Sequence, residues 1–169
     1  AAQLIKEGDS VIINVGSTSY YVAQEFKTKK NIIVITNTLM IFNELAYYKN
    51  LTTLFLGGLF NSEMQVTYGD DTIEQLSKYK ADKLIIGMDG IDINAGATTY
   101  NHFEDTIMRL MMERSKEKIL IVDDSKLGKV TFAHIAPLTD FDTVVTNYVP
   151  QHEHYYENLR DLGLNVITA

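Results

Sequence analysis

Short runs rich in valine and isoleucine alternate with segments of helical period along the chain, and this alternation limits the possible folds more than any other feature. The predicted strands are residues 11–15, 32–35, 53–56, 83–88, 119–122 and 143–146, with a short edge strand at 166–167. The predicted helices are residues 1–7, 19–27, 38–48, 72–79, 103–116 and 153–162. Continuous apolar strands joined by helices are typical of a parallel sheet covered on both faces. We therefore predict a three-layer α/β fold, with a mostly parallel open sheet of about six strands and helices on both faces.

Two segments show neither period. Residues 59–69 give no prediction of a regular element. Residues 89–102 are polar and contain glycine, and they predict a long loop after the fourth strand.

Length and composition exclude several classes of protein. The chain has 169 residues, enough for one compact domain with a buried core, and we expect a single domain over residues 1–169. It has no cysteine, which excludes disulfides, thiolate zinc sites and cysteine nucleophiles. Its 15 Lys+Arg and 22 Asp+Glu give a net charge of −7, which argues against this segment gripping a nucleic-acid backbone by itself. No apolar run approaches the roughly 18 residues of a membrane span. We expect a soluble cytoplasmic protein that holds no metal and no cofactor.

Polar residues and glycines follow the predicted strands. Because ligands of an open α/β sheet bind at the carboxyl ends of its strands, these residues define a candidate pocket. Such residues are also common turn formers and helix caps, so their presence alone does not define the chemistry. The candidates are Gly16, Ser17, Thr18, Ser19, Thr36, Asn37, Gly57, Asp89, Gly90, Asp92, Glu104 and Lys126.

The turn after the first strand carries the clearest chemistry. Gly16 lets a ligand approach the backbone, and Ser17, Thr18 and Ser19 supply three hydroxyls and free amides at a helix start. With the helix dipole, this makes a small anion cradle suited to phosphate. The alternative is an ordinary helix cap with spare hydroxyls. Neither the G-x-x-x-x-G-K-[ST] nor the G-x-G-x-x-G pattern occurs in the chain.

Charged residues follow the later strands. Asp89 and Asp92 can bind sugar hydroxyls, act as a base or hold a metal, or they can simply cap a turn. Glu104 opens the next helix, where the helix dipole favours an acidic residue in any case. Lys126 can neutralise a phosphate or pair with a neighbouring aspartate on the surface.

Other conspicuous residues give weaker evidence of a functional site. His152 and His154 lie at a helix start, where a His-x-His spacing puts the two rings on different faces. Met108, Met111 and Met112 are typical of a core or an interface. The chain has ten tyrosines, which indicates a surface for self-association, and we expect a homo-oligomer, a dimer or a tetramer.

Six segments also occur in the order and spacing of a known family. They are Gly16-Ser17-Thr18, Val34-Ile35-Thr36-Asn37-Thr38, Leu56-Gly57-Gly58, Gly87-Met88-Asp89-Gly90-Ile91-Asp92, Gly96-Ala97-Thr98-Thr99 leading to Glu104, and Val122-Asp123-Asp124-Ser125-Lys126. Together they resemble the C-terminal effector-sensing domain of DeoR-type bacterial transcriptional regulators, over residues 1 to about 147.

The resemblance implies a Rossmann-like fold similar to ribose-5-phosphate isomerase, and a sensor of a phosphorylated sugar. It implies that the Ser/Thr turn takes the phosphate and that Asp89, Asp92, Glu104 and Lys126 contact the sugar's reacting end. A helix-turn-helix DNA-binding domain would precede Ala1 in such a regulator, and DNA would be contacted through that domain alone.

Three departures from the resemblance bear on catalysis. Asn14 stands where the family usually carries aspartate, residues 93–97 lack the Lys-Gly-Gly of the isomerases, and Met108 stands where many members have lysine. Isomerisation needs a base together with a cation or donor for the developing charge. We therefore expect a repressor-type sensor that is not an enzyme. The alternatives are an isomerase of the same fold and an oligomerisation module with a vestigial pocket.

Overall fold

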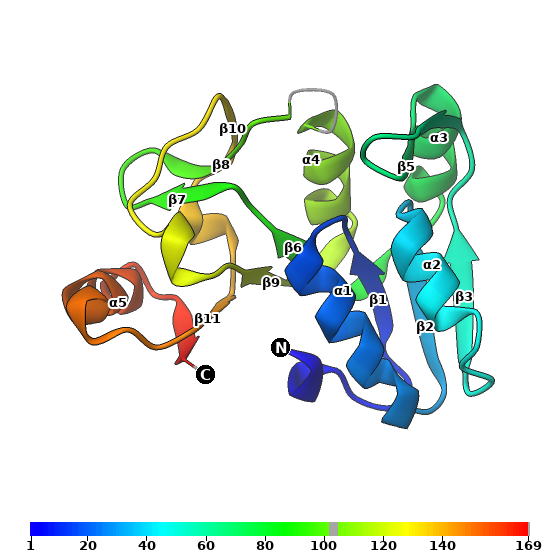
Figure 1. Ribbon diagram of the computed structural model, residues 1–169, viewed down its shortest axis with the longest axis horizontal. Helices are drawn as coiled ribbons and strands as arrows, with labels where there is room; N and C mark the ends of the chain where they lie inside the picture. Colours follow the sequence, from blue (N-terminus) through cyan, green and yellow to red (C-terminus); the bar gives the residue numbers. More distant parts are fainter. Residues whose placement is uncertain (102–104, 169) are drawn as a thin grey trace.

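The computed structural model describes residues 1–101 and 105–168, and in these ranges seven parallel strands form one central sheet (Figure 1). The order across the sheet is β12-β11-β9-β6-β1-β2-β3. Every neighbouring pair is parallel, as the apolar runs predict. The bounds are β1 Ser10–Ile13, β2 Ile32–Thr36, β3 Leu51–Phe55, β6 Ala81–Gly87, β9 Ser115–Ile121, β11 Thr143–Thr146 and β12 Asn165–Thr168.

Helices cover both faces of this sheet, which confirms the three-layer prediction. The α-helices are α1 Ser17–Gln24, α2 Leu39–Leu45, α3 Asp70–Ser77, α4 Asp105–Glu113 and α5 Glu153–Asp161. Side chains of β1 alternate between the faces: Val11 and Ile13 join the core under α1 and α2, while Ile12 joins the core under α3, α4 and α5. Within the described residues, no helix is both long and apolar enough to cross a membrane.

Most of the loop predicted over residues 89–102 is a hairpin instead, and residue 102 lies outside the described residues. The hairpin is antiparallel, with strands β7 Gly90–Asp92 and β8 Gly96–Thr99, and β8 also pairs with β10 Ala133–Ala136. These strands have three or four residues each, too few to show a two-residue period. Pairing with a segment distant in sequence stabilises them, and such pairing leaves no local pattern.

The aperiodic residues 59–69 also form a hairpin, β4 Leu59–Asn61 and β5 Val66–Tyr68. Two predicted helix ends are wrong. The first predicted helix is only a 3₁₀ turn, Ala2–Leu4, and the helix predicted over 103–116 ends at Glu113, because β9 begins at Ser115. The other predicted strands and helices are present, with ends that shift by a few residues.

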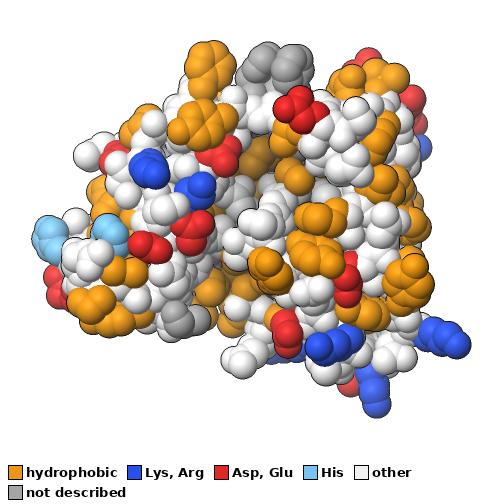
Figure 2. Space-filling view, in the orientation of Figure 1, with side chains coloured by type: hydrophobic (Ala, Val, Ile, Leu, Met, Phe, Trp, Pro, Cys, Tyr) orange, Lys and Arg blue, Asp and Glu red, His pale blue; other side chains and the backbone are white. Residues whose placement is uncertain are grey.

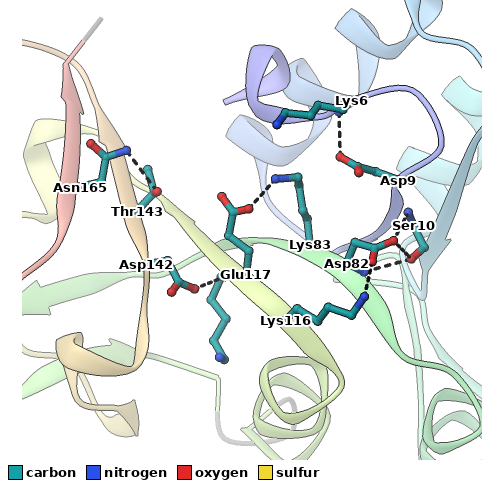
Figure 3. A network of polar contacts seen from close by, with 11 residues as sticks. Lys6, Asp9, Ser10, Asp82, Lys83, Lys116, Glu117, Asp142, Thr143 and Asn165 are labelled. Atoms are coloured by element: carbon teal, nitrogen blue, oxygen red, sulfur yellow. Dashed lines mark hydrogen bonds and ion pairs between the residues drawn. The ribbon is translucent and has the colours of Figure 1, made fainter.

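Polar side chains at the amino ends of the strands explain why the start of β9 looks like a helix in the sequence. Figure 3 shows Lys116 of β9 beside Asp82 of β6, 2.7 Å between Nζ and Oδ1. Ser10 of β1 donates its hydroxyl to Asp82 Oδ2 at 2.7 Å and its amide to the same oxygen at 3.0 Å. The Lys116 ammonium and the Ser10 donors hold the pKa of Asp82 well below its usual range. These cross-strand contacts account for charged residues within a strand.

Candidate functional site

The order of the central sheet reverses between β1 and β6, because the chain runs outward from β1 through β2 to β3 and from β6 through β9 to β12. In open α/β sheets, a crevice opens at the carboxyl ends of the two strands beside such a reversal. A cavity of about 280 Å³ lies there. It is lined by the segments that follow β1, β6 and β9, by the end of β8, and by single residues of α4 and the β4–β5 turn.

The start of α1 forms one end of this cavity. Gly16 has φ +145° and ψ +148°, a conformation in which the backbone leaves β1 and enters the helix at once. The first helical hydrogen bond runs from the Tyr20 amide to the Gly16 carbonyl at 3.0 Å. The amides of Ser17, Thr18 and Ser19 therefore precede the hydrogen-bonded part of the helix, and those of the exposed Ser17 and Thr18 are open to a ligand. Ser17 and Thr18 are exposed, and all four residues from Gly16 to Ser19 line the cavity.

Asn14 holds this turn in place. Its side chain is 3% exposed, and its Oδ1 accepts hydrogen bonds from the Gly87 amide at 3.0 Å and from the Ser19 hydroxyl at 3.5 Å. One side chain thus joins the end of β1, the end of β6 and the first turn of α1. The Ser19 hydroxyl is used inside the protein, which leaves those of Ser17 and Thr18 for a ligand.

The two aspartates predicted at the same rim have different surroundings. Asp89 follows β6 and lines the cavity, and its Oδ2 accepts from the Thr99 hydroxyl at 2.9 Å and the Tyr100 amide at 3.0 Å. Asp92 caps the β7–β8 turn instead, because its Oδ1 accepts from the amides of residues 94 and 95 at 2.9 and 2.8 Å. The turn-cap alternative therefore describes Asp92, whereas Asp89 faces the cavity as a fixed carboxylate.

Lys126 lies at the end of the cavity that follows β9. Neither neighbouring aspartate pairs with it: Asp123 accepts from the Ser125 amide at 2.9 Å, and Asp124 accepts from the Asn147 side chain at 2.8 Å. Of the described residues that line the cavity, Lys126 is the only cationic one, and its ammonium has no ion-pair partner in the described part of the chain.

Five of the sequence candidates do not belong to the described lining of this cavity: Thr36, Asn37, Gly57, Gly90 and Asp92. The first three lie at or after the carboxyl ends of β2 and β3, on the far side of β1 from the reversal, and their polar groups serve the fold. Thr36 Oγ1 accepts from the amide of residue 38 at 3.1 Å, and the Gly57 amide donates to a glutamine of α3 at 3.0 Å. Gly90 allows a close approach, since a Cβ there would lie 2.5 Å from a backbone oxygen. Glu104 lies outside the described residues.

Comparison with known proteins identifies the family of this chain. The family described as DeoR C terminal sensor domain matches residues 1–148. The chain belongs to this family.

Curated relatives of this DeoR sensor domain are bacterial regulators. A putative aga operon transcriptional repressor of Escherichia coli O157:H7 is 29% identical over 168 residues, which cover 99% of this chain and 62% of the relative. The HTH-type transcriptional repressor GlcR of Bacillus subtilis is 33% identical, over 89% of this chain and 57% of GlcR. The glycerol-3-phosphate regulon repressor of Escherichia coli K12 is 27% identical, over 88% and 59%. The chain therefore spans about three fifths of the length of these relatives.

Solved structures share the fold of this sensor domain at low identity. Ribose 5-phosphate isomerase A from Neisseria gonorrhoeae superposes with a TM-score of 0.55 at 16% identity, over 78% of this chain and 50% of the isomerase. eIF2B beta from Chaetomium thermophilum superposes with a TM-score of 0.56 at 14% identity, over 85% and 45%. The fold thus occurs both in an isomerase and in an eIF2B subunit, so the functional assignment must rest on the site.

The sensor domain's cavity also contains residues that the strand-end rule misses. Met64 comes from the turn between β4 and β5, Asn101 follows β8, and Met108 comes from α4. Met64 lies in a segment without period, so nothing in the sequence places it near Gly16. Met108, noted in the sequence as a substitution for lysine, does line the cavity and gives that wall an apolar surface.

The sensor domain keeps its small antiparallel sheet against α5 through one tyrosine. The hydroxyl of Tyr155 donates to the Ile91 carbonyl at 2.6 Å, and burial raises the pKa of Tyr155 to about 12.

In the described residues, no group of three or more His, Asp or Glu side chains is arranged to hold a metal ion. His154, at the start of α5, lies 3.7 Å from Glu157 on the surface.

Proposed function

We propose that this sensor domain binds a phosphorylated sugar in the cavity between the ends of β1 and β6. One observation carries the proposal: a single cavity combines an open helix start, a fixed carboxylate, and a lysine that has no ion-pair partner among the described residues. Its volume of about 280 Å³ is at or below the lower end of the range for drug-sized ligands, so it suits a monosaccharide phosphate better than a dinucleotide.

The helix start, Asp89 and Lys126 each have a role in this proposal. The amides of residues 17–19 and the hydroxyls of Ser17 and Thr18 hold the phosphate, and the α1 dipole favours its charge. Asp89 accepts hydrogen bonds from sugar hydroxyls, because Thr99 and the following amide fix its carboxylate at the rim. Lys126 offsets the phosphate charge or binds the carbonyl end of an open-chain sugar. The chain's net charge of −7 repels an anion, so these local groups must supply the attraction.

Binding without turnover is part of the proposal. Enediolate chemistry needs a positioned base together with a nearby cation or donor, and residues 93–97, which lack the Lys-Gly-Gly of the isomerases, contain no lysine. The relatives named above are transcriptional regulators. With ribose 5-phosphate as the probe, we expect no aldose–ketose interconversion above the rate without protein. Conversion at enzymatic rates would overturn this part.

We also propose that the full-length protein is a repressor of a carbohydrate operon, whose helix-turn-helix part contacts DNA in the cytoplasm. GlcR carries the description HTH-type, and the chain covers only 57% of it, which leaves room for such a part. Ligand binding in the sensor domain then shifts the oligomer between arrangements with different DNA affinity. The test is operator affinity of the full-length protein with and without the sugar phosphate that binds best; unchanged affinity would contradict the switch.

A homo-oligomer suits this proposal, because helix-turn-helix regulators read paired half-sites as dimers. Figure 2 shows hydrophobic side chains gathered over the face where α1 and α2 lie. Tyr21 of α1 and Tyr47, which follows α2, are 66% and 84% exposed. Light scattering of the purified chain measures its mass directly, and a monomer at all concentrations would contradict the oligomer.

Thermal shift with a panel of sugar phosphates tests binding itself. A ligand at a hundred times its Kd stabilises by about 2.7 kcal/mol, which raises Tm by about 5–11 °C in a domain of this size. The double variant Ser17→Ala/Thr18→Ala removes two hydroxyls that make no hydrogen bond with other described residues, so it should fold normally and lose the shift. Thr52→Ala, an exposed position on the edge strand β3, is the matched control. No shift with any phosphate would favour the assembly module.

A further inference from the structure

The turn between β4 and β5 is fixed by its own hydrogen bonds. Asn61 Oδ1 accepts from the amides of Glu63 and Met64, both at 3.0 Å, and the Gln65 side chain donates to the Ser62 carbonyl at 2.7 Å. Gln65 has φ +57°, in the left-handed region that non-glycine residues adopt mainly in tight turns. The backbone of Met64 therefore has a defined position relative to the hairpin.

The hairpin is in turn fastened to the segment between β2 and α2. Asn37 is 2% exposed, and its Nδ2 donates to the Thr67 carbonyl at 2.8 Å. The Thr67 amide donates back to the Asn37 carbonyl at 2.9 Å, and the Leu39 amide donates to the Gln65 carbonyl at 2.8 Å. These bonds act as a short antiparallel ladder, with Asn37 adding a buried side-chain bond. The hairpin thus cannot move away from β2 without breaking several bonds.

This fastening brings Met64 to the cavity. Met64 and Met108 both line it, although one comes from the hairpin and the other from α4. The turn beside β5 points toward α4 in Figure 1, and the Asn101 side chain donates from Nδ2 to the sulfur of Met64. Met64 therefore forms part of the cavity wall beside Asn101.

We propose that Met64 is a specificity-determining residue of this cavity and that Asn37 is the positioning residue that holds it there. The inference rests on the proposed function and adds a limit on the length of the ligand that the cavity accepts. A thioether wall offers few hydrogen-bond partners to a sugar hydroxyl and fills space according to its rotamer. Ligands longer than the space between the phosphate cradle and Met64 are then disfavoured. Asn37 does not contact the ligand; it acts through the hairpin.

The experiment compares two probes of different length, glycerol 3-phosphate and glucose 6-phosphate, by calorimetry on the purified chain. In Met64→Ala the ratio of the Kd for the longer probe to that for the shorter one should fall at least tenfold, because the space beyond Cβ opens. Met40→Ala is the matched control, because Met40 is 39% exposed on α2 and lines a separate groove. The Kd ratio of the two probes in this variant should equal that of the unmodified chain.

Asn37 is tested through coupling. Asn37→Ala should change the ratio in the same direction as Met64→Ala, and the double variant should change it no further than Met64→Ala alone. Without any ligand, amide exchange at residues 65–67 should speed up in Asn37→Ala. If Asn37 served only global stability, exchange would speed up across the whole chain and not only in this hairpin. If Asn37→Ala fails to fold, Asn37→Ser keeps a donor at the same site, and Met64→Ala still stands as the test.

The outcomes separate the two proposals. A Kd ratio that stays within threefold of the unmodified chain in Met64→Ala, while both probes still bind, overturns the inference and leaves the proposed function intact. Failure of both probes and of the wider panel to bind the unmodified chain overturns the proposed function and this inference with it. If the effects of the two substitutions on the Kd ratio add in the double variant, the positioning role of Asn37 is overturned and the role of Met64 stands.

Discussion

Gly16→Ala tests how far the cradle depends on its backbone conformation. A Cβ at this position would lie 3.5 Å from the Ser19 hydroxyl, an ordinary contact, so crowding costs little. The cost comes from φ +145°, a region almost confined to glycine, and amounts to about 1–3 kcal/mol. At about 2–4 °C per kcal/mol for a domain of this size, Tm should fall by about 2–12 °C. The chain relieves this strain by rotating the peptide planes that carry the amides of residues 17 and 18, which misplaces the cradle.

Gly8→Ala is the matched control for this variant. Gly8 has φ +90°, nothing lies within 4 Å of its Cβ position, and it precedes β1 outside the cavity lining. Both variants should lower Tm by scanning fluorimetry, but only Gly16→Ala should weaken glucose 6-phosphate binding, by at least tenfold in calorimetry. If Gly16→Ala is destabilised yet binds with the Kd of the unmodified chain, the phosphate does not sit on this turn and the reasoning is refuted.

Three further changes have defined outcomes. Asp82→Asn should flatten the loss of stability on acidification, because the pKa of Asp82 is lowered in the fold. The stability that the Asp82 carboxylate contributes is present above about pH 4 and disappears as the pH falls toward its folded pKa. The urea midpoints of the two proteins should therefore converge in acid, and parallel midpoint curves would contradict this role of Asp82. Tyr155→Phe should cost about 0.5–1.5 kcal/mol in urea unfolding, because the carbonyl that it leaves keeps a second donor; no change would contradict the anchor role. Lys126→Gln should raise the Kd of glucose 6-phosphate about ten- to a hundredfold and reduce its salt dependence with Tm unchanged; an unaltered Kd would remove Lys126 from the site.

The central sheet follows from the sequence because its strands are buried on both faces. Val11, Ile12 and Ile13 are each fully buried, so the run needs no alternation and is apolar throughout. The polar residues that follow the strands predict a ligand site at the carboxyl edge of the sheet, but they do not by themselves single out β1 and β6. The start of β9 escapes the rule for buried strands because Lys116 and Glu117 pair with residues of the neighbouring strand β6 near its amino end, where charge is tolerated.

The small antiparallel sheets do not follow from the sequence. Their strands are short, and their partners lie far along the chain: His134 of β10 is opposite Thr98 of β8. Loop closure between such segments depends on the surrounding core, which a local window does not contain. For the same reason nothing local brings Met64 to the cavity.

Polar residue type alone also fails to separate ligand groups from structural ones. Asp89 and Asp92 are three residues apart and chemically identical, yet one faces the cavity and the other caps a turn. Asn37 follows its strand as Ser17 follows β1, but its amide is turned to the β4–β5 hairpin. Strand order separates Ser17 from Asn37, since the reversal lies between β1 and β6. Asp89 and Asp92 both follow β6, and only their hydrogen bonds distinguish them.

The most direct test of the account is a nitrogen-15 amide spectrum of the chain titrated with glucose 6-phosphate and, separately, with glucose. We predict that the amide signals of Ser17, Thr18 and Ser19 shift strongly with the phosphorylated sugar and stay in place with glucose. If these three signals do not move while the phosphorylated sugar binds, or if both sugars move them equally, the phosphate is not held by the start of α1 and the central claim is wrong.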